Sequence, residues 1–367
     1  MFFVRTSALG LLLIALSAAA APPISAETVR PTVWQVPTGE SFEGRLSEVL
    51  GSVVVVAGKN RNALLLLKGL SDAEMEQVAD FLQVKAAGPA VWQDSNAKVS
   101  KALRGKLQQL QEGRLVDVDL KSRPEPEVYL IYFSAGWCPP CHRFMPFLVK
   151  AYERYQKAVP GKVEVIFVSS DEGASQQVAY VKKSAMPWPV LRFSALRSVR
   201  EIERWAGSGI PCLVAITRSG DVLFHSYKGD EYLGPDHVLA ACDQLIETMT
   251  ANAPSARRDR HRLAVIEHLR TTTARETEPK PYLLYMDGKK YGEMQAGPFP
   301  LDLNIDERGR VVTTRFGDDV PAALRDMLTA DVSQWLFLPA VKAGQPHACT
   351  VRVPVKIGGA SAVASGK

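Results

Sequence analysis

The chain has 367 residues, with 44 Lys and Arg against 39 Asp and Glu, and a formal net charge of +5. Its content of 46% hydrophobic and 23% charged residues is that of a globular protein and excludes a charge-rich disordered chain. Of five cysteines only Cys138 and Cys141 are close in sequence, which excludes the disulfide framework of a small secreted domain. At roughly 100–200 residues per domain, we expect two or three domains.

The N-terminal residues 1–26 have the pattern of a secretory signal peptide. One arginine precedes an apolar run over residues 8–21, and small residues and prolines follow it. The run is shorter than the roughly 20 residues that a bilayer-spanning helix needs. We therefore expect export to the periplasm, cleavage near Glu27, and no transmembrane span in the mature chain.

Residues 30–84 predict a small β unit closed by a helix. The stretch "SFEGRLSEV" alternates, "VVVVAG" reads as a buried strand, and "ALLLLKGL" as the strand that returns after a turn. Ser71 and Glu74 match the capping box that begins a helix. The unit resembles the Sla-type homology domain, a compact Src-homology-3-like β barrel, which implies a structural or protein-binding module. The residues that carry this resemblance are Trp34, Gly39, Phe42 and Gly44, followed by "LSDAEMEQVADFL".

Residues 85–124 predict a linker. It holds turn-rich residues, a short helix over residues 98–113, and the proline-containing spacer "KSRPEPE".

Residues 125–250 alternate between strand and helix patterns. Apolar runs at residues 128–134 and 163–170 predict buried strands, and "CLVAITRSGDVLFHSY" predicts two more around a turn. Four segments predict helices: residues 139–158, 175–185, 198–207 and 236–249. The alternation predicts an α/β domain with a sheet that contains parallel strands and carries helices on its faces.

The last third of the chain predicts a connector and a small α+β domain. Residues 251–281 are polar and basic; their run "ARRDRHRL" could contact nucleic acid, but we expect a solvated helix face. Residues 282–358 predict a hairpin, a helix over residues 320–335 and a final strand "CTVRVPVKI", before a disordered tail at residues 359–367.

This block resembles the C-terminal domain of TonB-type energy transducers. The resemblance rests on the Asp-Glu-Arg-Gly turn, on the final "VRVPVKI" and on six single residues: Trp335, Phe337, Pro339, Ala340, Gly344 and Pro346. It implies a partner in the cell envelope. Because the long proline-rich stalk and membrane anchor of that family are missing here, docking or dimerisation is the role that remains.

The segment "WCPPCH", residues 137–142, admits three interpretations. Zinc needs four ligands, and neither a second C-x-x-C pair nor a matching histidine cluster exists, so we expect no metal. C-x-x-C-H is also the attachment motif of c-type haem, with His142 as its histidine. The third interpretation is a redox dithiol, which the flanking strand and helix favour, because a small helical cytochrome would not place the motif between them.

The spacing of Cys138 and Cys141 suits a dithiol that opens and closes. If Pro139 begins a helix, the cysteines lie one turn apart, with Cβ atoms about 5–6 Å from each other. Cys138 then sits at the positive end of the helix dipole, which favours its thiolate. Cys141 lies one turn further in and is better shielded, so the pair offers an attacking and a resolving thiol.

Several separated motifs resemble the thioredoxin-like domain of the tryparedoxin and nucleoredoxin type. They are "YFSAGWCPPCHRFMPFLVKAY", "VEVIFVSSDE", "MPWPV" and "GIPCLVAI". The resemblance implies that Trp137 flanks the active site, that Pro211 is a cis-proline facing the dithiol, and that the Ile210 backbone pairs with a substrate strand. It also implies that Pro146 kinks the helix.

Two residues depart from ordinary thioredoxins or add to them. Tyr132 stands where those proteins carry a buried Asp that assists proton transfer, so the acid–base partner of Cys141 is unassigned. Cys212 follows Pro211 directly and is expected near the site in a structural role, although a third thiol there could also modulate the dithiol.

The sequence thus predicts an exported thiol–disulfide oxidoreductase without an organic cofactor, acting on protein substrates with an electron donor or acceptor that is unknown. Two alternatives stay open: a non-enzymatic envelope adaptor that uses the flanking domains, and a c-type haem protein.

Overall fold

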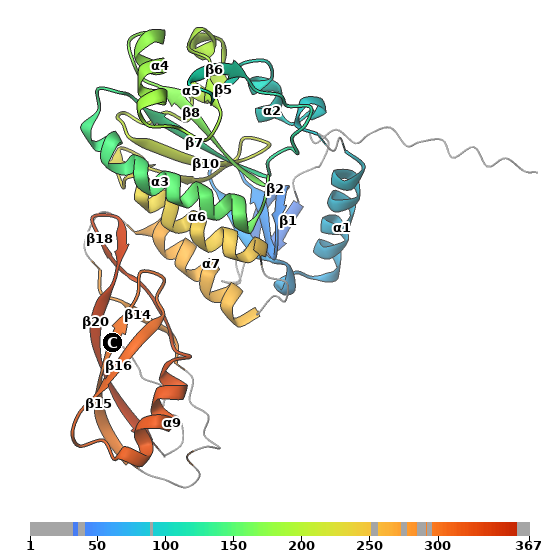
Figure 1. The fold of residues 1–367 in the computed structure, drawn as a ribbon. Helices are drawn as coiled ribbons and strands as arrows, with labels where there is room; N and C mark the ends of the chain where they lie inside the picture. Colours follow the sequence, from blue (N-terminus) through green and yellow to red (C-terminus); the bar gives the residue numbers. More distant parts are fainter. Residues whose placement is uncertain are drawn as a thin grey trace, which may run out of the picture.

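A seven-stranded mixed sheet forms the centre of the protein (Figure 1). The computed structural model describes residues 32–35, 41–88, 91–250, 256–272, 277–284, 291 and 296–357. The strand order is β11-β10-β7-β8-β9-β5-β6, with β7, β8 and β9 parallel and the other pairs antiparallel. The strands are β5 (Leu107–Gln111), β6 (Arg114–Asp117), β7 (Val128–Ser134), β8 (Val163–Ser169), β9 (Val190–Leu191), β10 (Cys212–Thr217) and β11 (Val222–His225).

Helices cover both faces of this sheet, as the sequence predicts. Side chains alternate along β7, so that Leu130 and Tyr132 enter one core while Ile131 and Phe133 enter the other. The first core is covered by α3 (Pro139–Ala158), α4 (Ala174–Lys183) and α6 (Pro235–Thr250). The second is covered by α2 (Lys98–Leu103), by the short 3₁₀ helix η3 (Phe193–Ser198) and by α5 (Arg200–Glu203).

Three sequence predictions about this domain are wrong. The segment predicted as a linker over residues 85–124 contributes α2 and then the β5–β6 hairpin, which extends the sheet. The predicted helix over residues 98–113 ends at Leu103, and Glu112 and Gly113, both with positive φ angles, form the two-residue turn of the β5–β6 hairpin. The helix predicted over residues 198–207 shrinks to the four residues of α5.

The N-terminal unit is a four-stranded antiparallel sheet followed by a helix. Its strands are β1 (Thr32–Gln35), β2 (Ser41–Leu50), β3 (Val53–Ala57) and β4 (Asn62–Leu66), paired in sequence order. The predicted capping box is confirmed at the start of α1 (Asp72–Ala87): Ser71 Oγ accepts from the Glu74 N–H, and Glu74 Oε2 accepts from the Ser71 N–H. The described strands form an open sheet, and the Src-homology-3-like barrel stays a prediction.

This N-terminal sheet is packed on the central domain. All residues of β3 are buried, since Val53 and Val55 join the main core below α6 while Val54 and Val56 face Trp34. A strand buried on both faces explains the uninterrupted apolar run "VVVVA".

The predicted polar connector, residues 251–281, contains a helix that belongs to the core. This helix, α7 (Ala256–Thr271), buries Val265, Ile266 and Leu269 in the main core. The basic residues around them hide their helical spacing in the sequence. The prediction of a connector is wrong for this helix, because it packs into the main core. The predicted helix itself is present, with Arg262 paired to Asp259 and to Glu247 of α6.

The C-terminal unit is a small α+β domain that extends below the rest of the molecule in Figure 1. The three-stranded sheet β16-β15-β20 packs on α9, which confirms the predicted hairpin, helix and last strand. The TonB-like identity of this unit stays a prediction. Its elements are β14 (Lys280–Leu283), β15 (Ala296–Ile305), β16 (Val311–Phe316), α9 (Ala322–Val332), β17 (Leu336–Leu338), β18 (Ala340–Lys342), β19 (Gln345–His347) and β20 (Cys349–Ile357).

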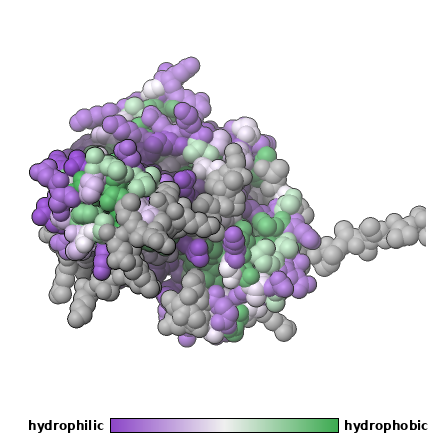
Figure 2. Space-filling model, turned by 90° about the horizontal axis from the view of Figure 1, so that it is seen from below, coloured by the Kyte–Doolittle hydropathy of each residue, from purple (hydrophilic) through white to green (hydrophobic). Residues whose placement is uncertain are grey.

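The surface seen from below is mostly hydrophilic with smaller hydrophobic areas (Figure 2). One such area lies on the right, the side where Figure 1 places α1, which exposes Met75, Leu82 and Val84. Across the described parts of the chain, every helix is too short or too polar to cross a lipid bilayer. The predicted signal peptide, residues 1–26, and the tail, residues 359–367, lie outside the described residues.

Three histidines attach the C-terminal unit to α6 and α7. His237 Nδ1 donates to the Gly344 carbonyl at 2.7 Å, His261 Nε2 to the Phe337 carbonyl at 2.7 Å, and His268 Nε2 to the Pro339 carbonyl at 3.1 Å. Burial lowers the pKa of all three imidazoles below the ordinary value of 6.5. Among the described residues, the charged groups that act on them are mainly basic: Lys228 at His237; Arg262 and Arg310, with the carboxylate of Asp306, at His261; and Lys280 at His268.

Acidification is therefore expected to weaken the attachment of the C-terminal unit. Since the free histidines bind protons at a higher pH than the docked ones, stability is full above about pH 6.5 and falls as the pH drops through the lowered pKa values. Urea unfolding between pH 8 and pH 5 measures this loss. The triple variant His237→Gln, His261→Gln and His268→Gln keeps a donor at each site and should flatten the pH dependence; an unchanged slope would contradict the prediction.

Candidate active site

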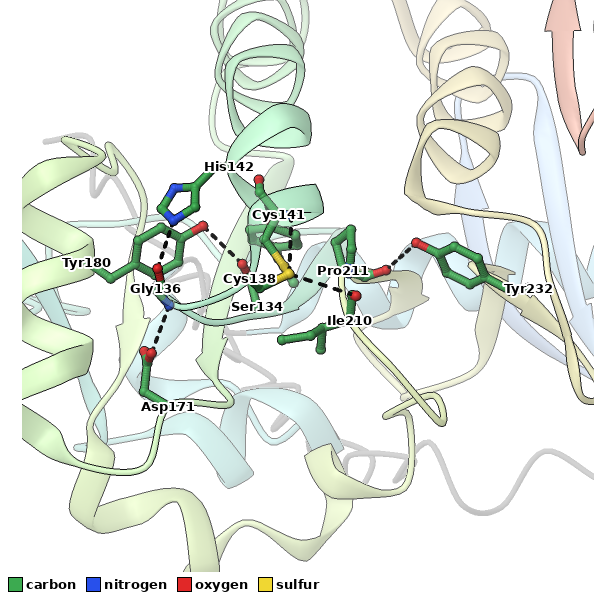
Figure 3. Close-up of a disulfide and its surroundings, with 11 residues drawn as sticks. Ser134, Gly136, Cys138, Cys141, His142, Asp171, Tyr180, Ile210, Pro211 and Tyr232 are labelled. Carbon is green, nitrogen blue, oxygen red and sulfur yellow. Dashed lines mark hydrogen bonds between the residues drawn. A yellow bond between two sulfur atoms is a disulfide. The ribbon is translucent and has the colours of Figure 1, made fainter.

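A disulfide between Cys138 and Cys141 lies at the N-terminus of α3 (Figure 3). The two Cα atoms are 5.3 Å apart, which agrees with cysteines one helical turn from each other. Cys138 is the N-cap residue, and its Sγ accepts the Cys141 N–H at 3.2 Å. The helix begins at Pro139 and Pro140, where a missing N–H costs little. The sequence prediction for this turn is confirmed.

The loop opposite the disulfide carries the predicted cis-proline. The Ile210–Pro211 peptide bond is cis, and the Ile210 carbonyl oxygen lies 3.9 Å from Cys138 Sγ (Figure 3). Ile210 also packs against the two cysteines and Ala135 in a small apolar cluster. Cys138 and Ile210, which are 72 positions apart in sequence, are thus neighbours in the fold.

The loop before Cys138 is held at both polar groups of Gly136. The Gly136 N–H donates to Asp171 Oδ1 at 2.7 Å, and His142 Nε2 donates to the Gly136 carbonyl at 2.8 Å. Asp171 is buried and is itself held by the Ser169 hydroxyl, which donates to Oδ2 at 2.7 Å. His142, the residue that completes the haem-like motif, thus makes a local structural contact.

Loss of the Asp171 carboxylate is expected to destabilise this loop. Asp171→Ala leaves the half-buried Gly136 N–H without its acceptor, and we expect a loss of about 1–3 kcal/mol in the free energy of unfolding. Urea denaturation measures it, with Glu172→Ala as the control, because Glu172 is exposed and should change stability by less than about 0.5 kcal/mol. Equal losses in the two variants would contradict the prediction.

Tyr132 lies next to Cys141 of the disulfide, and its side chain is neutral. It is fully buried, and its hydroxyl donates to the Cys141 carbonyl oxygen at 3.4 Å. Burial raises its pKa well above the ordinary value, so the phenol stays protonated at neutral pH. Nearby, the hydroxyls of Ser134 and Tyr180 are 3.0 Å apart, and Tyr180 packs edge-on against the His142 ring.

The remaining predicted residues differ in their accessibility. Trp137 is 61% exposed and precedes Cys138, which is itself buried. Cys212 is fully buried, pairs with Phe133 across β10 and β7, and belongs to the core on the other face of the sheet. Burial raises the pKa of the Cys212 thiol to about 11, which keeps it protonated and makes it a poor nucleophile.

Three residues of this site are not predicted from the sequence: Asp171, Tyr180 and Tyr232. Asp171 lies in the quoted motif "VSSDE", but its bond to Gly136 joins positions 35 residues apart and has no local pattern. Tyr232 donates to the Pro211 carbonyl oxygen at 2.8 Å (Figure 3). Only the folded chain brings these partners together.

Comparisons with known proteins concern the part of the chain that carries this site. A family model described as thioredoxin-like matches residues 126–222. Tryparedoxin of Trypanosoma brucei brucei is 40% identical over 101 residues, which cover 27% of this chain and 67% of that protein. The chain belongs to the thioredoxin-like family. Cys138, Cys141 and Pro211 all lie inside the matched residues of this thioredoxin-like redox protein.

The share of the relative that this chain covers differs from one relative to another. Probable nucleoredoxin 2 of Oryza sativa subsp. japonica is 36% identical over 103 residues, covering 28% of this chain and 25% of that one. A solved structure of tryparedoxin from Trypanosoma brucei is 32% identical, covers 35% of this chain and 85% of its own, and has a TM-score of 0.29. The N- and C-terminal units lie outside the family match.

Proposed function

We propose that this chain is an exported thiol–disulfide oxidoreductase that exchanges disulfides with protein substrates through Cys138 and Cys141. The observation that supports this most is the Cys138–Cys141 disulfide at the start of α3, with the Ile210 carbonyl beside Cys138. Such an exchange needs no organic cofactor. It needs a second dithiol or disulfide as electron donor or acceptor.

Cys138 is the proposed attacking thiol. It sits at the N-terminus of a 20-residue helix, where the helix dipole and the Cys141 N–H stabilise a negative sulfur. The exposed Trp137 beside it marks the side from which a substrate approaches. Cys141 is fully buried, one turn inside the helix, and is the proposed resolving thiol.

The reaction proceeds in two exchanges. The Cys138 thiolate attacks one sulfur of a substrate disulfide, forms a mixed disulfide and releases the other substrate sulfur as a thiolate, which takes up a proton. The Cys141 thiol loses its proton and attacks Cys138 Sγ, which closes the internal disulfide and releases the second substrate thiol. Two electrons pass from the dithiol to the substrate, and an external dithiol restores the enzyme. Oxidation of substrates is the same sequence in reverse.

The backbone at Ile210 is the proposed docking edge for the substrate. An extended segment that pairs with this loop places its disulfide next to Cys138, since the Ile210 carbonyl is 3.9 Å from Cys138 Sγ. Trp137 and Pro211 flank this edge and are proposed to contact the substrate.

Export and the roles of the flanking units are parts of the same proposal. Export rests on the signal-peptide pattern of residues 1–26, and N-terminal sequencing of the secreted protein should find a start near Glu27. The N- and C-terminal units, with their Sla-type and TonB-like resemblance, are proposed to position the redox domain or to recruit envelope partners.

The test is the reduction of insulin, a protein with disulfide-linked chains, by the purified full chain with dithiothreitol as electron source. Catalysis should make the freed insulin chains precipitate much faster than dithiothreitol alone does. A rate equal to that of dithiothreitol alone would overturn the oxidoreductase and favour the adaptor. An absorption spectrum with a covalent Soret band would instead establish the haem protein.

A further inference from the structure

A tyrosine-bearing hairpin supports the cis-proline loop from behind. Its strands β12 (Tyr227–Lys228) and β13 (Glu231–Tyr232) place the two tyrosine rings 4.9 Å apart. Tyr227 lies against Gly207, where a Cβ would come within 2.1 Å of its ring. Tyr232 Oη holds the Pro211 carbonyl at 2.8 Å. The hairpin therefore contacts the loop on both sides of Ile210.

The C-terminal unit contacts the residues that directly follow Tyr232. Gln345 Nε2 of its β18–β19 hairpin donates to the Leu233 carbonyl at 2.8 Å. Gly344, at the turn of that hairpin, has φ +76° and lies so close that a Cβ would be 3.0 Å from the same carbonyl. His237 binds the Gly344 carbonyl at 2.7 Å, and Leu233 is buried. Two elements separated by more than 100 residues are thus fastened together beside the redox site.

We propose that the β18–β19 hairpin of the C-terminal unit positions the redox site: by holding Leu233 it holds Tyr232, and Tyr232 is a positioning residue for the Ile210–Pro211 substrate edge. This inference rests on the proposed oxidoreductase function. It gives the C-terminal unit a direct influence on how protein substrates bind, although this unit lies outside the thioredoxin-like match.

The contacts form a short series from one unit to the other. Gln345 binds the Leu233 carbonyl, Tyr232 is the adjacent residue, and its hydroxyl binds Pro211, whose neighbour Ile210 faces Cys138. If the hairpin contacts are lost, Cys138 and Cys141 should keep their positions, but the Ile210–Pro211 backbone opposite them should become more mobile. Binding of extended protein substrates should suffer, while the reaction of Cys138 with a small disulfide, which does not need that edge, should not.

The test compares Tyr232→Phe and Gln345→Ala in the full chain. Each should lower kcat/KM for insulin about threefold to tenfold, mainly by raising KM, as expected for one lost hydrogen bond. The rate with dithionitrobenzoate, a small disulfide, should change by less than about twofold. Because the two residues act in series, the double variant should lose no more than Tyr232→Phe alone. Hydrogen exchange of residues 207–210 should become about tenfold faster in both variants.

Matched controls and outcomes separate this inference from the proposed function. Tyr282→Phe removes the hydroxyl of a tyrosine whose overall exposure is similar to that of Tyr232 and which also donates to a backbone carbonyl, that of Arg260. Gln156→Ala removes an amide bonded to the Val163 carbonyl. Both should behave like the parent protein. Additive losses, equal losses with the small disulfide, or unchanged exchange at residues 207–210 would overturn the positioning role. If the parent protein fails to reduce insulin while exchange responds as expected, the proposed function fails and the positioning contact stands.

Discussion

Replacing Cys138 with serine is expected to lower the rate of insulin reduction by more than about a thousandfold, to the level of dithiothreitol alone. A serine hydroxyl cannot form the mixed disulfide on which the exchange depends. The helix N-terminus and the Cys141 N–H, 3.2 Å from Sγ, stabilise a thiolate but cannot make an alkoxide available at neutral pH. The insulin assay measures the loss, and a Cys138→Ser variant that keeps more than about a tenth of the activity would contradict the assigned role.

Two further cysteine variants sharpen this expectation. Cys141→Ala keeps the attacking thiol but cannot resolve the mixed disulfide, so it should trap substrate proteins in a reductant-sensitive covalent complex. Cys349→Ser is the matched control, because Cys349 is a free cysteine of the C-terminal unit, and it should keep full activity. If Cys141→Ala traps nothing while Cys138→Ser is inactive, the order of attack in the proposed mechanism is wrong.

The candidate site divides into a part that local sequence predicts and a part that it does not. The position of Cys138 before Pro139 predicts the N-cap and the one-turn separation, because capping and helix spacing are local properties. The cis bond at Pro211 came from a family resemblance and is present in the structure. Neither the local sequence nor the family resemblance predicts a role for Asp171 or Tyr232, since each binds a single backbone group of a distant segment.

The errors in the fold have a common physical cause. Apolar side chains in residues 107–117 and 256–271 are outnumbered by polar ones, so both segments resemble exposed connectors. Yet Leu107 and Leu269 are buried, because an edge hairpin or a one-sided helix needs only a few apolar residues to attach to an existing core. Strong apolar runs predict β7 to the residue and β8 to within one residue at its end, since both faces of these strands are buried.

A buried ionic network joins the N-terminal unit to the turn between β10 and β11. Glu48 of β2 is fully buried and accepts from Arg218 Nε at 2.6 Å and from Lys85 Nζ at 2.9 Å. Arg218 also donates to Glu125 at 2.8 Å, and Lys85 to Glu127 at 2.8 Å. Because each charge in this network has a partner from another segment, the N-terminal unit and the central domain should unfold together.

Removing Arg218 should therefore be strongly destabilising. Arg218→Met keeps much of the apolar stem but removes one of the two cations paired with the buried Glu48 carboxylate, whose other partner is Lys85. We expect a loss of about 3–5 kcal/mol in the free energy of unfolding. Urea denaturation followed by tryptophan fluorescence measures it, since Trp34 and Trp188 report on the two units. Arg204→Met is the control: its pair with Glu201 is largely exposed and should contribute less than about 1 kcal/mol. A loss below about 1 kcal/mol for Arg218→Met, or two separate transitions in the parent protein, would mean that the N-terminal unit folds independently of this network.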